Sequence, residues 1–251
     1  MKLSVIVITK NEAACIGQCL ASVAFADEII VLDSGSEDGT PEICRRLGAR
    51  VENVDWPGFG PQKQRALDLA TGDWVLSLDA DEMVSEDLQR EIREAIAGNH
   101  HPVYLLPRLS SYLGRPMRHS GWWPDYVARL FRREAARFSP DLVHERLLYE
   151  GQAGRLRSPL LHDTYTSVEE IIDKFNRYST AGAEMAFAKG RRSSLKLAVL
   201  KGMVAFIRTY VLRRGFLDGR EGFMVAVSNA EATYYRQVKL MQLAKRRDDA
   251  A

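Results

Sequence analysis

The stretch Trp74-Val75-Leu76-Ser77-Leu78-Asp79-Ala80-Asp81-Glu82 guides the interpretation of the whole sequence. Its apolar run, followed by carboxylates, is typical of a buried parallel strand that ends in a charged loop. Asp79 and Asp81 are two residues apart, so at the end of an extended strand we expect both side chains on one side. Two such carboxylates repel one another unless a cation lies with them, which favours a divalent-ion site. A pair of solvated loop aspartates is the alternative without function.

Bulk composition is that of a globular protein. The 251 residues are 46% hydrophobic and 27% charged, enough for one large domain or a domain with an appendage. The 35 basic and 33 acidic residues nearly balance, so the net charge of +2 indicates no particular partner. Cys15, Cys19 and Cys44 lack companion metal ligands and suggest reduced thiols in a cytosolic protein. We see no signal peptide after Met1 and no apolar run of about 18 residues that would span a membrane.

Strands and short helices alternate along the first 80 residues. Apolar runs at 3–9, 28–32 and 50–54 each precede a helical pattern, and the strand ending at Asp79 follows the third of these helices. This order predicts an α/β fold with a Rossmann-like, mostly parallel central sheet flanked by helices. Ligands bind such sheets beyond the carboxyl ends of the strands. Four polar side chains fall there, namely those of Thr9, Asp33, Asp79 and Asp81.

Three ordered segments of this half resemble the signatures of family 2 glycosyltransferases, which have the GT-A fold. They are SVIVITKNE (4–12), DSGSEDGT (33–40) and GDWVLSLDAD (72–81). Two positions depart from the family pattern, because Ile8 replaces a proline and Ser34 replaces the second aspartate of the usual Asp-Asp-Gly-Ser. Neither change removes a principal ligand.

The resemblance implies roles for single residues. Asp81, supported by Asp79, is the expected ligand of Mg²⁺ or Mn²⁺ on the donor diphosphate, and these ions do favour carboxylates. Asp33 is expected on the uracil and Asp79 near the ribose. The full set of expected nucleotide-sugar ligands is Thr9, Glu12, Asp33, Lys63 and Asp79. A GxGxxG fingerprint and a P-loop are both absent, which argues against dinucleotide and ATPase chemistry.

An inverting transferase needs a base that takes the proton of the acceptor hydroxyl. The candidates are Glu145, Asp125 and His144. In family members with a similar Arg-x-Phe-Arg-Arg strand before His-Glu, the glutamate stands where the base is expected, so we expect Glu145 first and Asp125 second. A structural pair of His144 and Glu145 bound to an arginine is the alternative. Arg129 is either a diphosphate ligand or a surface charge, and His162 is expected to be structural, although it could complete a metal shell.

Adjacent tryptophans, Trp122 and Trp123, precede a proline and an aspartate. Flat rings cover the apolar face of a pyranose, so this pair suits a stacking platform for the acceptor sugar. A hydrophobic plug over a sheet edge explains the pair equally well.

The C-terminal third is helical in pattern, and its segment 189–220 is both basic and apolar. We therefore expect a catalytic domain over residues 1–165 and a helical appendage over 166–251. The segment favours binding to a membrane surface and would suit a phosphorylated lipid acceptor. Packing of this helix on the catalytic domain is the alternative. No nucleic-acid-binding motif is present.

The segments 121–125, 143–145 and 213–223 extend the resemblance to one branch of the family, the lipopolysaccharide core glucosyltransferases. This implies an inverting, metal-dependent enzyme that moves a hexose, glucose in this branch, from a UDP-sugar to a lipid-linked saccharide of the lipopolysaccharide inner core. It also implies a cytoplasmic protein, peripheral at the cytoplasmic face of the inner membrane. The alternatives are a sugar-phosphate nucleotidyltransferase, which would normally show a glycine-rich basic loop near its N-terminus, and a non-catalytic membrane-associated scaffold.

Overall fold

The computed structural model describes residues 1–142, 145–165 and 167–248, and the chain forms two compact units. We call Met1–Leu109 with Asp125–His162 the sheet unit, and Ser110–Pro124 with Asp163–Ala251 the helical unit. Strands β6 and β12 each continue from one unit into the other. Residues 110–124 thus group with the C-terminal helices, whereas the sequence-based division had a single boundary at residue 165. The division by function stays a prediction.

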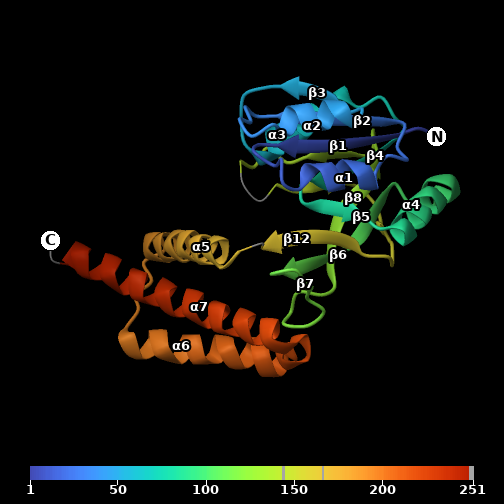
Figure 1. The fold of residues 1–251 in the computed structure, drawn as a ribbon. Helices are drawn as coiled ribbons and strands as arrows, with labels where there is room; N and C mark the ends of the chain where they lie inside the picture. Colours follow the sequence, from blue (N-terminus) through green and yellow to red (C-terminus); the bar gives the residue numbers. More distant parts are fainter. Residues whose placement is uncertain (143–144, 166, 249–251) are drawn as a thin grey trace. The chain divides into compact units, whose positions relative to one another are not determined.

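The sheet unit is built on four parallel strands in the order β3, β2, β1, β4 (Figure 1). Antiparallel strands β8 and β6 extend the sheet beyond β4, and β12 and β5 follow them. The Rossmann-like arrangement predicted from the sequence is confirmed. Strand bounds are β1 Leu3–Thr9, β2 Glu28–Asp33, β3 Arg50–Asn53, β4 Trp74–Asp79, β5 Glu82–Val84, β6 Val103–Tyr112, β8 Asp125–Arg132, β11 Gly154–Arg155 and β12 Leu160–Tyr165.

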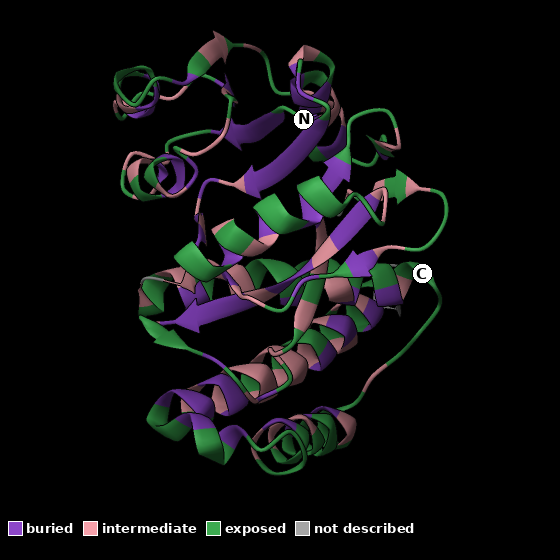
Figure 2. Ribbon diagram, turned by 90° about the vertical axis from the view of Figure 1, so that its right-hand side faces the viewer, coloured by how far each residue is buried: buried purple, intermediate pink, exposed green. Residues whose placement is uncertain are grey.

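Side chains alternate across each strand, and this divides the core into two layers. Val5 and Val7 of β1 belong to a buried cluster with helices α1, α2 and α4, whereas Ile6 and Ile8 belong to a cluster with α3. Figure 2 shows buried strands between helices whose outer faces are exposed. Helix bounds are α1 Ile16–Ser22, α2 Thr40–Arg46, α3 Phe59–Leu69 and α4 Glu86–Gly98.

A small hairpin of β9 (Ala136–Phe138) and β10 (Leu147–Tyr149) packs against the start of α3. The backbone N–H of Gly60 donates to the carbonyl of Asp141 at 3.1 Å. A Cβ atom on Gly60 would lie 2.0 Å from the carbonyl oxygen of Ser139, so only glycine permits this approach. The part of the hairpin connection at Ser139 and Asp141 is thereby held against the first turn of α3.

Within the described residues, the helical unit contains three helices with two short turns between the second and third, together with β7 and the ends of β6 and β12. Helices α5 and α6 both pack on α7 (Figure 1). Ser167 and Ser194 begin α5 and α6 as N-caps, each accepting a backbone N–H on its hydroxyl oxygen. Within the described residues, no helix combines the length and apolar character that crossing a bilayer requires. Bounds are β7 Arg115–Pro116, α5 Val168–Ala188, α6 Leu195–Ile207, a π-helical turn Arg208–Leu212, a 3₁₀ turn Gly215–Asp218 and α7 Gly219–Asp248.

All three cysteines are free thiols, and their surroundings predict low reactivity. Burial, and for Cys15 the neighbouring Glu12 carboxylate, raises the pKa of Cys15 to about 12, and burial raises the pKa of Cys44 to about 11. Burial also raises the pKa of Cys19 well above its ordinary value. Because the thiolate is the nucleophile, we expect slow alkylation by iodoacetamide at pH 8 and rapid labelling of all three thiols after unfolding in urea. Mass spectrometry measures both rates, and fast labelling of native Cys44 would contradict this expectation.

Candidate active site

The carboxyl ends of β1 and β2 form the first part of the site. Thr9 and Asp33 are register partners, and the Thr9 hydroxyl donates to Asp33 Oδ1 at 3.1 Å. Asp33 Oδ2 accepts the backbone N–H groups of Gly35 and Ser36 at 3.0 and 2.9 Å, and the Ser36 hydroxyl donates to Oδ1. The loop after β2 therefore folds around a buried carboxylate, with Gly35 in the left-handed region at φ 79°. The expected role of Asp33 on uracil stays a prediction.

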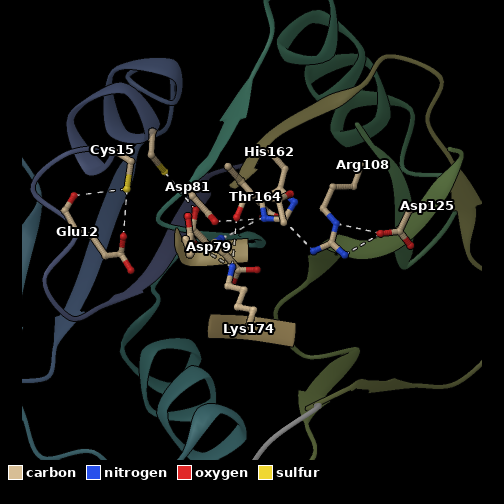
Figure 3. Close-up of polar contacts among 12 residues, drawn as sticks. Glu12, Cys15, Asp79, Asp81, Arg108, Asp125, His162, Thr164 and Lys174 are labelled. Atoms are coloured by element: carbon tan, nitrogen blue, oxygen red, sulfur yellow. Dashed lines mark hydrogen bonds and ion pairs between the residues drawn. The ribbon is translucent and has the colours of Figure 1, made fainter. Parts of the chain in front are cut away.

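Glu12 lies in the loop after β1. Its backbone N–H donates to the Thr40 hydroxyl at 2.9 Å, and its Oε2 accepts from Cys15 Sγ at 3.2 Å (Figure 3). These contacts fix Glu12 beside the start of α1. Its expected role as a nucleotide ligand stays a prediction.

Asp79 and Asp81 do not lie on one extended strand, so the extended backbone on which the same-side expectation rested is absent, and that expectation stays a prediction. Strand β4 ends at Asp79, and Ala80 and Asp81 form a turn. The turn closes when Glu82 Oε2 accepts the backbone N–H of Asp79 at 3.0 Å. The two aspartates consequently have different partners, and Asp81 Oδ2 lies 3.2 Å from Nε2 of His162 (Figure 3).

Lys63 brings together residues from three segments. It projects from α3, its side chain is only 4% exposed, and its Nζ donates to Asp79 Oδ1 at 2.8 Å and to Glu145 Oε1 at 2.6 Å. A buried ammonium group requires such partners, because an unpaired charge is costly away from water. The structure thus joins the expected ribose-side aspartate, the expected nucleotide-side lysine and the expected base in one contact.

Arg129 neutralises the other side of Asp79. Its Nη2 contacts Asp79 Oδ2 and donates to Glu82 Oε1 at 2.7 Å. Burial alone would raise the pKa of Asp79, but Arg129 and Lys63 outweigh burial and hold that pKa well below its ordinary value. Burial would likewise lower the pKa of Arg129, whereas Asp79 and Glu82 raise it. Arg129 is therefore a buried ion-pair partner, and its interpretation as a surface charge is wrong.

Arg108 extends this arrangement to Asp125. Its Nε and Nη2 donate to Asp125 Oδ2 at 3.0 and 2.7 Å, and its Nη1 lies 3.6 Å from Glu82 Oε1 (Figure 3). Acidic and basic side chains thus alternate through one series, which we call the charge series. Its members in order are Glu145, Lys63, Asp79, Arg129, Glu82, Arg108 and Asp125. The two leading candidates for the base stand at its two ends.

Sequence reasoning missed Glu82 and Arg108 as site residues. Glu82 is completely buried although it directly follows the D-x-D motif. The apolar pair Met83-Val84 that follows Glu82 was the only local signal that this carboxylate is buried. Arg108 lies within β6, which continues through Tyr112.

Asp81 is the residue on which binding of a divalent ion at this site would depend. Among the residues that the structure describes, no group of three or more His, Cys, Asp or Glu side chains forms a complete protein cage. Mg²⁺ and Mn²⁺ bound with a nucleotide typically take one or two carboxylates together with phosphate oxygens, so a cage is not required. Asp81 and His162 offer an oxygen and a nitrogen ligand and fit such an ion. Both oxygens of Asp79 contact basic side chains instead, and its role as a metal ligand stays a prediction.

The remaining candidates lie elsewhere or outside the described residues. Trp122 belongs to the helical unit, where its ring packs edge-to-face against Tyr112 with 5.9 Å between centroids. The Arg118 guanidinium lies 5.5 Å from the ring centroid of Trp123. His144 is outside the described residues. The acceptor role of both tryptophans and the catalytic role of His144 stay predictions.

Comparison with known proteins gives concordant results. The family model described as glycosyl transferase family 2 matches residues 4–160. A Rickettsia typhi protein described as an uncharacterized glycosyltransferase is 31% identical over 97% of this chain and 88% of its own length. The lipopolysaccharide core biosynthesis glycosyltransferase LpsC of Rhizobium meliloti is 29% identical, covering 96% of this chain and 93% of LpsC. The crystal structure of S. aureus TarS 1-349 in complex with UDP-GlcNAc has a TM-score of 0.51 and 16% identity, covering 99% of this chain and 92% of that one, a likeness of fold.

Replacing Arg129 by methionine should destabilise the protein, because Asp79 and buried Glu82 lose their shared cation. We expect the free energy of unfolding in urea, followed by circular dichroism, to fall by about 3 kcal/mol. The matched change Arg137→Met on the exposed side of β9 should alter it by less than about 0.5 kcal/mol. Equal urea midpoints for Arg129→Met and the wild type would show that the charge series does not stabilise the fold.

Proposed function

Because this chain belongs to glycosyl transferase family 2 and has the GT-A fold, we propose that it is an inverting hexosyltransferase with a UDP-sugar donor, UDP-glucose in the first instance. The observation that carries the proposal is the double contact of Lys63 with Asp79 and Glu145. This contact links Asp79, at the edge of the sheet where the sugar donor is expected to bind, to Glu145, the expected base.

The names of relatives support the proposed substrates. TarS is described in complex with UDP-GlcNAc, which supports a UDP-sugar as donor. LpsC is described as a lipopolysaccharide core glycosyltransferase, which supports a lipid-linked saccharide of the lipopolysaccharide inner core as acceptor. Family membership favours sugar transfer over the nucleotidyltransferase alternative.

The nucleotide would bind at the carboxyl ends of β1 and β2 against Thr9, Glu12 and Asp33. A carboxylate has about four acceptor positions, and the loop after β2 together with Thr9 supplies four donors to Asp33. The N–H of a uracil must therefore replace one of these donors. The Thr9 hydroxyl is the simplest to replace, because it rotates away without any movement of the backbone, whereas the Ser36 hydroxyl also accepts the N–H of Asn11 at 2.7 Å.

Asp81, with His162 beside it, would hold Mg²⁺ or Mn²⁺ on the diphosphate, and the ion would supply positive charge to the leaving group. Glu145 would accept the proton of the acceptor hydroxyl while that oxygen bonds to the anomeric carbon and the bond from this carbon to the diphosphate breaks. UDP then leaves, and an α-linked donor gives a β-linked product. Lys63 positions the carboxylate through Oε1, and within the described residues Oε2 has no hydrogen-bond partner and can take the proton.

The acceptor would be reached at a membrane surface through α6 and the turns that follow it. Only Ala198 and Gly202 of α6 are buried, against α7, while large apolar side chains remain exposed, including Met203 at 58% and Leu212 at 72%. The exposed apolar set is Leu195, Val199, Leu200, Met203, Val204, Ile207, Val211, Leu212, Phe216 and Leu217. Lys196, Lys201 and Arg214 lie among these residues. Such a surface matches a bilayer interface that contains anionic lipid.

Titration calorimetry with UDP and Mn²⁺ tests the site. We expect metal-dependent UDP binding by the wild type, its loss in Asp81→Ala, and retained UDP binding with loss of sugar transfer in Glu145→Gln. Near-wild-type turnover by Glu145→Gln would move the base to Asp125. No binding of UDP or of other nucleotides by the wild type would favour the non-catalytic scaffold.

Vesicle sedimentation tests the membrane surface. Because burial of a methionine contributes about 1.5–3 kcal/mol, Met203→Glu should weaken binding to phosphatidylglycerol vesicles by about tenfold or more. Ile172→Glu makes the same kind of change at an exposed position of α5 and should have little effect. Raising the salt concentration should weaken binding further. Equal binding by both variants and the wild type would contradict a membrane role for this surface.

A further inference from the structure

The helical unit contains a basic cavity of about 380 Å³ that the proposed chemistry does not use. Three arginines line it. Arg208 begins the π-helical turn, Arg213 directly follows that turn, and Arg236 belongs to α7. No aspartate or glutamate lines it. Among the described residues, none of these three guanidinium groups has an ion-pair partner. Three like charges around one cavity repel one another, and an anion bound there would relieve that repulsion.

Two glycines make room for two of these arginines. A Cβ on Gly121, which has φ 83°, would lie 2.4 Å from Nη1 of Arg213. A Cβ on Gly182 of α5 would lie 3.0 Å from Cδ of Arg236. The Arg213 and Arg236 side chains therefore lie directly over glycine backbone, where a larger residue would displace them.

Backbone and buried side chains hold the wall of the cavity in place. The carbonyl of Arg213 accepts the N–H of Ser120, and the N–H of Arg213 donates to the carbonyl of Arg208, both at 2.9 Å. The buried Asp218 accepts the backbone N–H groups of Arg118 and His119 at 3.1 and 3.0 Å. The turn that carries Arg208 and Arg213 is thus tied to the loop that carries Gly121.

Neutral groups complete the cavity. Asn229 Nδ2 donates to the buried Thr209 hydroxyl at 3.3 Å, and the hydroxyl proton has no acceptor among the described residues. Trp122 lines the same cavity and presents an aromatic surface beside the arginines. Guanidinium and hydroxyl donors match phosphate oxygens, and an indole ring suits the apolar face of a sugar.

We propose that this cavity binds the phosphoryl group of a phosphorylated saccharide, as a subsite for the acceptor. The assignment to the acceptor rests on the proposed transferase function, whereas binding of the phosphoryl group does not. Arg208 and Arg236 would contact the phosphate, and Trp122 would lie against the sugar ring. A phosphate ester in a lipid headgroup offers the same chemistry, so the test separates the two sources.

Calorimetry with glucose 6-phosphate tests the cavity on the full chain, first alone and then with UDP and Mn²⁺ present. Charge-assisted hydrogen bonds each contribute roughly tenfold in affinity, so Arg208→Gln/Arg236→Gln should bind this probe at least about tenfold more weakly than the wild type. Arg177→Gln on α5 removes the same charge outside the cavity and should bind like the wild type. Binding of UDP should be equal in all three proteins, which shows that the variants are folded.

The outcomes distinguish this proposal from the proposed function. Binding of UDP without binding of glucose 6-phosphate, equal losses in the double variant and Arg177→Gln, or displacement of the sugar phosphate by UDP would each overturn the subsite. Arginine-dependent binding of glucose 6-phosphate without any binding of UDP would support the cavity and refute the transferase. If the double variant loses binding only to phosphatidic acid vesicles, and not to phosphatidylglycerol vesicles, the source is a lipid headgroup and the saccharide assignment is wrong.

Discussion

An acidic side chain can be buried at the end of a strand only where basic side chains balance its charge, and this requirement shapes the carboxyl edge of the sheet. Glu82 is wholly enclosed, and Arg129, with Arg108 farther away, supplies the positive charge that permits this. Helix α3, the end of β4, strand β8 and the β9–β10 hairpin all contribute to the charge series. Such a site is preorganised, because displacement of one member would leave its neighbour uncompensated.

The fold was largely predictable, and the polar geometry was only partly so. Apolar β-branched runs indicate parallel strands, and the rule that ligands bind beyond strand ends selected Thr9, Asp33 and Asp79. The turn at Ala80 was missed because a spacing of two residues describes only extended backbone. The contact between Lys63 and Glu145 joins positions 82 residues apart, and no local pattern encodes such a pair. The burial of Glu82 was invisible for the same reason.

In the C-terminal segment, basic and apolar residues are interspersed along the sequence but take different positions in the structure. From its sequence, the basic and apolar stretch predicted one membrane-binding surface. In the structure, the apolar side chains of α6 are exposed, whereas Arg208 and Arg213 line a cavity with Arg236 from α7, beyond that stretch. Membrane attachment and recognition of a charged group can therefore belong to different residues of one unit, and mutations can separate them.

Gly60 has a consequence for how related sequences are compared. The Ser139 carbonyl occupies the place of any side chain at position 60, and Ser139 and Glu145 both belong to the connection between β9 and β10. A chain that keeps the lysine and the glutamate but carries a larger residue at position 60 must place its hairpin differently. Glycine, lysine and glutamate at positions 60, 63 and 145 thus form a three-residue signature of this hairpin geometry.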